Sequence, residues 1–234
     1  MANTPGLRDL IAPWRSYVAE FLGTFFFVLI ANWVVLSASL YGEVSSLEVV
    51  LAVGFAYLAL LFTTIHIAGG FLNPAVTISM WLAKKISGSR ACFFLIAQIL
   101  ASFLAAEVLF LVFGQNAVQF HFGQGAFGLG VSTQTAFIAE AVLTGGLIFT
   151  IFGTMVDRNG PVSFGPLAVG LYLAAVGIVA LPISGAVFNP ARVLGPSLLS
   201  HESTNLVVFV VSSLVGSLIG PAYEFVFLQK SKKK

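Results

Sequence analysis

The tripeptide Asn-Pro-Ala occurs twice in this chain, at Asn73-Pro74-Ala75 and at Asn189-Pro190-Ala191. Asn is among the best N-cap residues and Pro is favoured in the first turn of a helix, so each tripeptide predicts a helix start. A helix N-terminus carries positive partial charge, and the Asn amide can donate a hydrogen bond. Two such ends that face each other would bind a water or another neutral oxygen and would repel a cation.

The composition places both helix starts inside a membrane. The chain has 234 residues, of which 58% are hydrophobic and only 9% are charged, whereas soluble domains are about a quarter charged. Six apolar runs reach the length of about twenty residues that crosses a bilayer. They lie at about 17–40, 48–67, 91–113, 135–156, 163–181 and 206–228. The sequence therefore predicts an all-α membrane protein with six transmembrane helices and excludes a large soluble core.

The two helices that begin at the Asn-Pro-Ala motifs are too short to cross. Residues 73–82 and 189–198 would each form about 15 Å of helix, half of a hydrocarbon core of about 30 Å. If these re-entrant half-helices enter from opposite faces and meet head to head, the backbone before each motif lies at membrane depth. Such backbone is tolerated only where it is buried in protein or lines a water-filled cavity. Seven carbonyl groups are therefore expected to line a pore, those of Gly69, Gly70, Phe71, Leu72, Gly185, Val187 and Phe188.

The two halves of the chain repeat each other. Residues 66–76 match 182–192 position by position, and residues 17–24 resemble 137–144. Each half has three crossings, an odd number, so the second half is inserted upside down relative to the first. We expect a single channel domain over 1–234, built as an inverted repeat with its functional site at the midplane. Its parts are repeat one at about 14–113, repeat two at about 134–228, and cytoplasmic tails at 1–13 and 229–234.

The basic residues set the expected orientation. Of the 11 Lys and Arg, all but Arg192 lie before the first span, after the first short helix, between spans four and five, or after the last span. With six crossings these segments share one side, which the positive-inside rule makes cytoplasmic. We therefore expect both termini in the cytoplasm. The plasma membrane is the expected location, and an intracellular membrane is the alternative.

The paired Asn-Pro-Ala motifs, the stretch 184–192 that ends in Arg192, and the paired Ala-Glu openings at Glu20 and Glu140 together resemble the major intrinsic protein family. This family comprises the aquaporins and glycerol facilitators, and the resemblance covers nearly the whole chain. It implies six tilted helices and two half-helices in each protomer, a pore in each protomer, and a homotetramer. General accounts of aquaporin-type pores attribute the exclusion of protons and cations to the half-helix dipoles and an Arg.

The resemblance also assigns an outer constriction. The family's spacing places Val53, Gly177 and Ala186 there, opposite Arg192, which would donate hydrogen bonds and repel cations. Water-selective members usually have Phe and His at the first two positions, and glycerol facilitators usually have two aromatic residues. Three small apolar groups opposite one Arg predict a constriction wider and less polar than a strict water filter. The alternative for Arg192 is an interfacial side chain that snorkels to the membrane surface.

Three further polar residues lie near the expected pore. Intramembrane carboxylates such as Glu20 and Glu140 can belong to proton relays, whereas the resemblance implies that they hold the loops before the half-helices. His66 precedes the first half-helix, where it could support the loop by hydrogen bonding or gate the pore by protonation. The single Cys92 allows no intrachain disulfide.

These features predict a passive channel for water and small uncharged solutes that excludes protons and ions. We expect no enzymatic activity, no cofactor and no metal. The expected partners are the permeant solutes, the lipid bilayer and further copies of the chain, not nucleic acid. Three alternatives remain: a facilitator for a larger neutral solute such as glycerol, urea, ammonia or a metalloid hydroxide, a proton-coupled transporter that uses Glu20 and Glu140, and a non-conducting junction protein.

Overall fold

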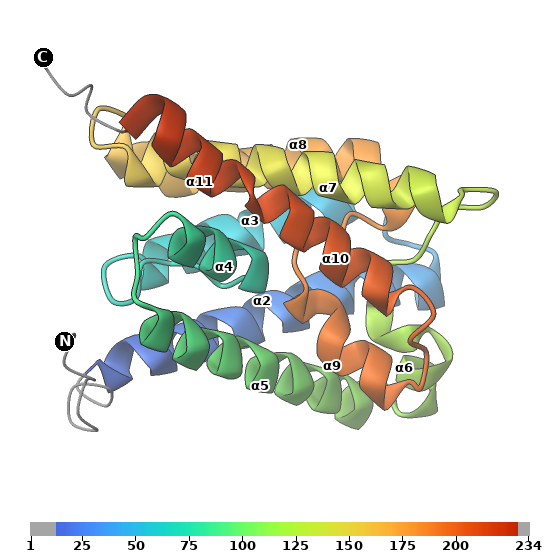
Figure 1. The fold of residues 1–234 in the computed structure, drawn as a ribbon. Coiled ribbons are helices and arrows are strands. Elements are labelled where there is room, and N and C mark those ends of the chain that lie inside the picture. Colours follow the sequence, from blue (N-terminus) through green and yellow to red (C-terminus); the bar gives the residue numbers. More distant parts are fainter. Residues whose placement is uncertain (1–12, 229–234) are drawn as a thin grey trace, which may run out of the picture.

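The computed structural model describes residues 13–228, which form an all-helical bundle (Figure 1). Its elements are α2 (Trp14–Tyr41), α3 (Ser46–Thr64), α4 (Pro74–Leu82), α5 (Gly88–Phe113), α6 (Gln115–Gln119), η1 (His121–Gly123), α7 (Thr133–Ile151), η2 (Phe152–Val156), η3 (Val162–Phe164), α8 (Gly165–Ser184), α9 (Ala191–Leu199), α10 (Leu206–Ser217), α11 (Ile219–Tyr223) and η4 (Glu224–Leu228). Six helical stretches are long and apolar enough to span a membrane, namely α2, α3, α5, α7 with η2, η3 with α8, and α10 through η4. The predicted six-span, all-α architecture is confirmed. Most of each expected tail, including Arg8 and Lys230, lies outside the described residues.

Polar caps mark the starts of three spanning helices. The Ser45 side chain accepts a hydrogen bond from the Glu48 N–H, and the Glu48 carboxylate accepts one from the Ser45 N–H, which makes a capping box at α3. Ser87 and Ser132 cap α5 and α7 in the same way through their side-chain oxygens. Each serine satisfies a backbone donor that has no partner inside the helix. Apolar spans therefore begin at polar residues.

The predicted limits of the six spans agree with the structure to within three residues, and two segments show where the sequence prediction falls short. The fifth span continues to Ser184 with Pro182 inside its last turn, although the expected end was residue 181. Pro182 has no N–H to donate, but the Gly185 N–H still bonds the Leu181 carbonyl at 3.1 Å and closes the final turn of α8. The outer segment after α5 folds into α6 and η1, which the sequence analysis left without structure.

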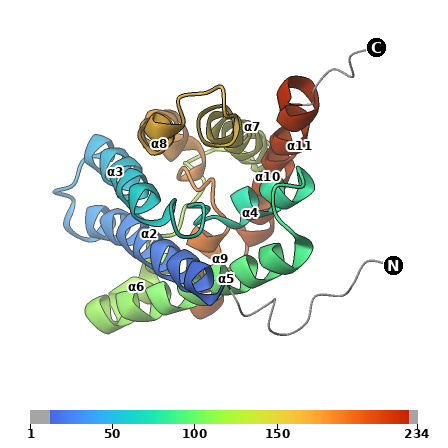
Figure 2. The same ribbon diagram turned by 90° about the vertical axis from the view of Figure 1, so that its left-hand side faces the viewer.

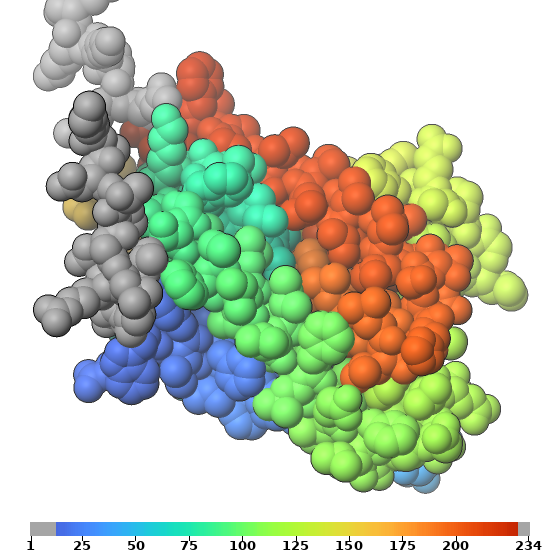
Figure 3. Space-filling model, turned by 60° about the horizontal axis from the view of Figure 1, so that its bottom comes forward, coloured from blue at the N-terminus to red at the C-terminus, as the bar shows by residue number. Residues whose placement is uncertain are grey.

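The two half-helices meet near the centre of the bundle. Helices α4 and α9 have nine residues each, and their N-terminal ends point toward each other (Figure 1). In an end view, the long helices surround the centre, where the segment before α4 lies (Figure 2). On the face drawn in Figure 3, α5 lies between α2 and the α9–α10 segment, and it contacts both α2 and α9.

Helices α3 and α8 cross in close contact and thereby form one side of this centre. A Cβ atom added to Gly54 would lie 2.8 Å from the Gly170 carbonyl oxygen, and one added to Gly170 would lie 2.9 Å from the Gly54 carbonyl oxygen. These distances leave no room for side chains, so the two backbones touch. The crossing brings Val53 of α3 and Gly177 of α8 to one cavity.

Candidate pore

Glu20 of α2 holds the loop before α4. Its side chain is completely buried, and its Oε1 accepts a hydrogen bond from the Phe71 N–H at 2.9 Å. Its Oε2 accepts from the Leu72 N–H at 2.8 Å and from Gln98 Nε2 at 2.8 Å. The carboxylate thus takes up two consecutive backbone donors of a loop that has no helical partner for them.

Glu140 of α7 makes the corresponding contacts in the second half. Its Oε1 accepts from the Val187 N–H at 2.9 Å and from Ser184 Oγ at 2.5 Å, and its Oε2 accepts from the Phe188 N–H at 2.8 Å. None of the hydrogen-bond partners of Glu20 or Glu140 is a titratable group. These contacts fit two fixed supports of the loops before the half-helices.

The loops need such support because their backbones are strained. Leu72, Ala186 and Phe188 have φ angles of 52°, 52° and 49°, in the left-handed region that costs a residue with a Cβ about 1–2 kcal/mol. At Gly70, the counterpart of Ala186, φ is 66° and glycine carries no such cost. This left-handed conformation points two successive backbone N–H groups of each loop toward one carboxylate, Glu20 or Glu140. Charge-assisted hydrogen bonds are stronger than neutral ones and can offset the strain.

The two Asn-Pro-Ala motifs contact each other across the junction of the half-helices. Asn73 Oδ1 accepts from the Ala75 N–H at 2.8 Å, and Asn73 Nδ2 donates to the Phe188 carbonyl at 2.9 Å. Asn189 Oδ1 accepts from the Ala191 N–H at 3.0 Å, and Asn189 Nδ2 donates to the Leu72 carbonyl at 2.8 Å. Each amide has a second N–H, and both Asn side chains line the same cavity.

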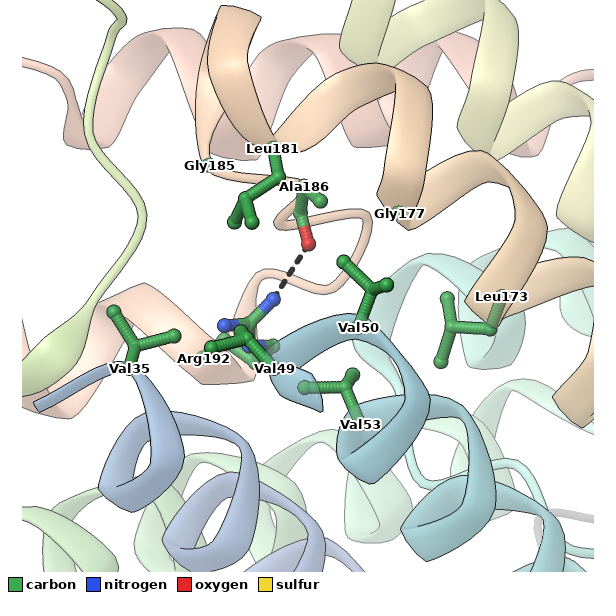
Figure 4. Close-up of a pocket in the computed structure, with 10 residues that line it drawn as sticks. All are labelled: Val35, Val49, Val50, Val53, Leu173, Gly177, Leu181, Gly185, Ala186 and Arg192. Carbon is green, nitrogen blue, oxygen red and sulfur yellow. Dashed lines mark hydrogen bonds between the residues drawn. The ribbon is translucent and has the colours of Figure 1, made fainter. Parts of the chain in front are cut away.

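Arg192 lies beside this junction and is buried, with 2% of its surface exposed. Its Nη1 donates to the Ala186 carbonyl at 2.5 Å (Figure 4), and its Nε donates to Asn32 Oδ1 at 3.3 Å. A guanidinium fixed by two internal acceptors does not snorkel to the membrane surface.

Asn32 of α2 is a site residue that the sequence analysis missed. In α9 the carbonyl of Arg192 would normally bond the N–H of residue 196, but Pro196 has none. Asn32 Nδ2 donates to that carbonyl at 2.9 Å, so one buried amide holds both the backbone and the side chain of Arg192. An Asn within the apolar run of the first span is the only sequence signal that could have indicated this role.

Side chains of α5 hold both half-helices. Ser102 Oγ accepts from the Gly195 N–H at 2.8 Å and donates to the Ala191 carbonyl, so it bridges a backbone pair of α9. Gln98 Nε2 donates to Thr77 Oγ1 of α4 at 2.8 Å. Because Gln98 also donates to Glu20, α5 ties the first half-helix to its loop support.

Two adjoining cavities follow the wall of the site. The outer cavity brings together the four residues expected at the constriction, Val53, Gly177, Ala186 and Arg192 (Figure 4). The inner cavity is lined by Phe27, Val53, Tyr57, Leu147, Leu173, Arg192, both motif Asn residues, Val187 and Phe188. Each offers about 10 Å³ to the centres of water-sized molecules, which is room for about a single water. Both cavities are small, whereas the three small apolar residues predicted a wide constriction.

Val50 of α3 explains much of this narrowness. A Cβ atom at Gly177 would lie 3.0 Å from Val50 Cβ and 3.0 Å from Val50 Cγ1, and Val50 points toward Gly177 in Figure 4. The space that the glycine leaves is therefore filled from the facing helix. Val50 is not one of the positions that the family spacing indicated.

The seven carbonyl groups expected to line a pore fall into two sets. Those of Phe71, Leu72 and Phe188 accept hydrogen bonds from Tyr57 Oη, Asn189 Nδ2 and Asn73 Nδ2, respectively. The carbonyl groups of Gly69, Gly70, Gly185 and Val187 accept none from the other described residues. Of these four residues, Gly185 lines the outer cavity and Val187 lines the inner cavity.

His66 makes no contact that would support the loop. Its side chain is exposed, and no hydrogen bond joins it to another residue within 13–228. Arg90 of α5 supports this stretch instead, because its Nη2 donates to the Ala68 carbonyl at 3.2 Å while its guanidinium lies over the Phe94 ring. Within the described part of the chain, no group of three or more His, Cys, Asp or Glu could hold a metal ion.

Known proteins are similar to this chain in sequence and in fold. The family model described as Major intrinsic protein matches residues 8–223. Aquaporin Z of Photorhabdus laumondii is 32% identical over 229 residues, covering 92% of this chain and 99% of its own length. Probable aquaporin TIP-type alpha of Phaseolus vulgaris is 36% identical over 221 residues, covering 90% of this chain and 84% of its own.

A solved structure shows the same fold. The aquaglyceroporin from Plasmodium falciparum superimposes with a TM-score of 0.81 at 23% identity, covering 92% of this chain and 97% of that one. Six spans, two half-helices joined at their Asn residues, and matches along nearly the whole chain agree with one another. The chain belongs to the major intrinsic protein family and is an integral membrane channel for water or small solutes.

Proposed function

We propose that this channel conducts water and small uncharged solutes passively and excludes protons and ions. The observation that carries the proposal is the reciprocal pair of bonds from Asn73 to Phe188 and from Asn189 to Leu72. These bonds aim two helix N-termini and two free amide N–H groups at one cavity with room for about a single water.

The chemistry of that cavity explains how protons would be excluded. A water that accepts hydrogen bonds from both Asn amides directs its own hydrogens away from the junction. It then cannot accept a hydrogen bond from the next water, so a proton cannot pass along the file. Cations meet the positive partial charge of about half a unit at each helix end and the buried charge of Arg192.

The free carbonyl groups give the water file its acceptors. Gly69 and Gly70 offer oxygens in the loop before α4, and Gly185 and Val187 offer them in the loop before α9. Donor and acceptor positions therefore follow each other along the path. We propose that these carbonyls line the pore, and that Val53, Gly177 and Ala186 form its outer constriction with Arg192.

Orientation and assembly belong to the same proposal. Arg15 lies at the start of α2, Lys84, Lys85 and Arg90 lie between α4 and the first turn of α5, and Arg158 lies between η2 and η3. These segments lie at one end of the bundle (Figure 1), where Lys85 Nζ pairs with Glu224 Oε2 at 2.6 Å. We propose that this end is cytoplasmic, that the two repeats form one channel domain, and that four copies assemble into a homotetramer. The plasma membrane is the proposed location.

A solute panel tests the proposal. Purified protein in liposomes is mixed with hyperosmotic solutions in a stopped-flow instrument, and light scattering reports the flux of water, urea and glycerol. We expect rapid water flux that neither saturates nor depends on a cation or pH gradient. Gradient-dependent flux would indicate a coupled transporter, and absence of any flux would indicate a junction protein.

The small residues Val53, Gly177 and Ala186 favour a second candidate, a facilitator mainly for a larger neutral solute. In the same assay this candidate predicts glycerol flux comparable to water flux.

A further inference from the structure

Tyr57 of α3 is, after Arg192, the largest fully buried side chain among the described residues, with 1% of its surface exposed. It lines the inner cavity together with Phe27 and the two motif Asn residues. Neither the motifs nor the family spacing for the outer constriction indicated this position. An aromatic ring thus lies on the pore wall one helical turn beyond Val53.

Two contacts fix the Tyr57 side chain. Its hydroxyl donates to the Phe71 carbonyl at 2.8 Å, and its ring packs edge to face against Phe27 with centroids 4.7 Å apart. If the ring moved away, the hydroxyl would lose its acceptor in a buried site, which is unfavourable. The hydroxyl also occupies a carbonyl in the very loop whose oxygens were expected to receive the permeant molecule.

Opposite Arg192, the side chains of the outer constriction have no comparable anchor. Val50 and Val53 face Gly177 and Ala186, and their aliphatic side chains make no hydrogen bonds that would fix them. A solute that displaces these side chains breaks van der Waals contacts but no hydrogen bond. The bonded ring of Tyr57 is more rigid than these aliphatic side chains.

We propose that Tyr57 sets the upper size limit of the permeant molecule and that it excludes glycerol even though the outer residues are small. This inference rests on the proposed water conduction. Glycerol must also give up hydrogen bonds to water as it enters, and the apolar ring offers no replacement, while the only hydrogen of the Tyr57 hydroxyl is already donated to the Phe71 carbonyl. Water passes because its donors and acceptors meet the Asn amides and the free loop carbonyls.

The test compares water and glycerol flux in proteoliposomes for the parent protein, Tyr57→Val, Tyr57→Phe and Val53→Ala. We expect Tyr57→Val to raise glycerol permeability by at least about tenfold, the lower end of what one methylene contributes to discrimination in an apolar pocket, while water flux persists. Tyr57→Phe keeps the ring and should remain closed to glycerol. Val53→Ala should also remain closed, because the ring lies beyond it.

Tyr172→Val is the matched control. Tyr172 of α8 also donates its hydroxyl to a backbone carbonyl, that of Leu143 at 3.0 Å, but it lines a groove on the outside of the bundle between α7, α8 and α10. Its loss removes a ring and a hydrogen bond without opening the pore, so glycerol permeability should not change.

The outcomes separate this inference from the proposed function. If the parent protein conducts water, and Tyr57→Val does not raise glycerol flux or Val53→Ala raises it equally, the inference is wrong and the function stands. Rapid glycerol flux through the parent protein also overturns it. If folded parent protein conducts no water, the proposed function fails first. Tyr57→Leu is measured alongside and is judged by the same criterion if the valine variant does not fold.

Discussion

Replacing Glu140 by Gln changes the set of acceptors that holds the second pore loop. The carboxylate accepts from Ser184 Oγ, from the Val187 N–H and from the Phe188 N–H. Gln has one acceptor oxygen and one NH2 group. If its oxygen takes the place of Oε1, the NH2 group faces the Phe188 N–H, donor against donor.

The magnitude follows from counting these bonds. A buried N–H left without a partner costs about 1–3 kcal/mol. The two remaining bonds, from Ser184 Oγ and the Val187 N–H, lose a charged acceptor. A neutral hydrogen bond is roughly half as strong as a charge-assisted one, so each of these bonds loses about 1 kcal/mol. The free energy of unfolding should therefore fall by about 3–5 kcal/mol. For a chain of this size that corresponds to a drop of about 6–20 °C in the unfolding temperature.

Thermal unfolding of the detergent-solubilised protein measures this drop, and water flux is measured well below it. Glu107→Gln is the matched control, because Glu107 is exposed on α5 and has no hydrogen-bond partner among the described residues. It should not lower the unfolding temperature. If Glu140→Gln unfolds within about 2 °C of the parent, equivalent to less than about 1 kcal/mol, the carboxylate does not support the loop. Unchanged stability with loss of a pH-driven flux would instead favour the proton-coupled transporter.

Three other substitutions test whether the charge of Arg192 excludes cations and whether water passes through the outer cavity. Arg192→Val should raise Na⁺ and K⁺ flux in liposomes while water flux persists, and unchanged cation exclusion would show that the half-helix ends suffice alone. Asn32→Asp places a carboxylate where an oxygen lies 3.3 Å from Arg192 Nε, an attraction of about 5 kcal/mol at an effective dielectric constant of about 20. The paired charges should admit more cations, and a variant as tight as the parent would contradict this. Ala186→Cys should make water flux sensitive to mercurials because residue 186 lines the outer cavity. Water flux through the parent should be insensitive to mercurials, because its single Cys92 is exposed on α5 and lines neither cavity. Inhibition of the parent that disappears in Cys92→Ser would contradict the assigned path.

The spans and half-helices could be predicted because their signals are local. Apolar runs of spanning length and an Asn-Pro pair at a helix start act through neighbouring residues. Glu20 and Glu140 could be singled out because they are carboxylates inside apolar runs and lie at matching positions of the two repeats. The end of α8 was harder to predict from the sequence. A proline usually marks the end of a helix, whereas Pro182 lies inside the last turn of α8.

The residues that narrow and hold the site could not be predicted in this way. Tyr57, Val50 and Asn32 are single members of apolar runs, and their partners are set by how helices pack. Asn32 meets Arg192 across 160 positions of sequence. The filling of the space beside Gly177 by Val50 depends on the crossing of α3 and α8. Counting residue sizes at three positions therefore predicted a wider constriction than the structure has.

The claim that the half-helix junction passes water but no protons can be tested most directly by measuring both fluxes on the same proteoliposomes. Stopped-flow light scattering gives the water permeability, and an entrapped pH-sensitive dye gives the proton flux under an imposed pH gradient. We predict water flux far above that of protein-free liposomes and proton flux equal to theirs. Proton flux that rises with the amount of protein, in step with water flux, would contradict the account.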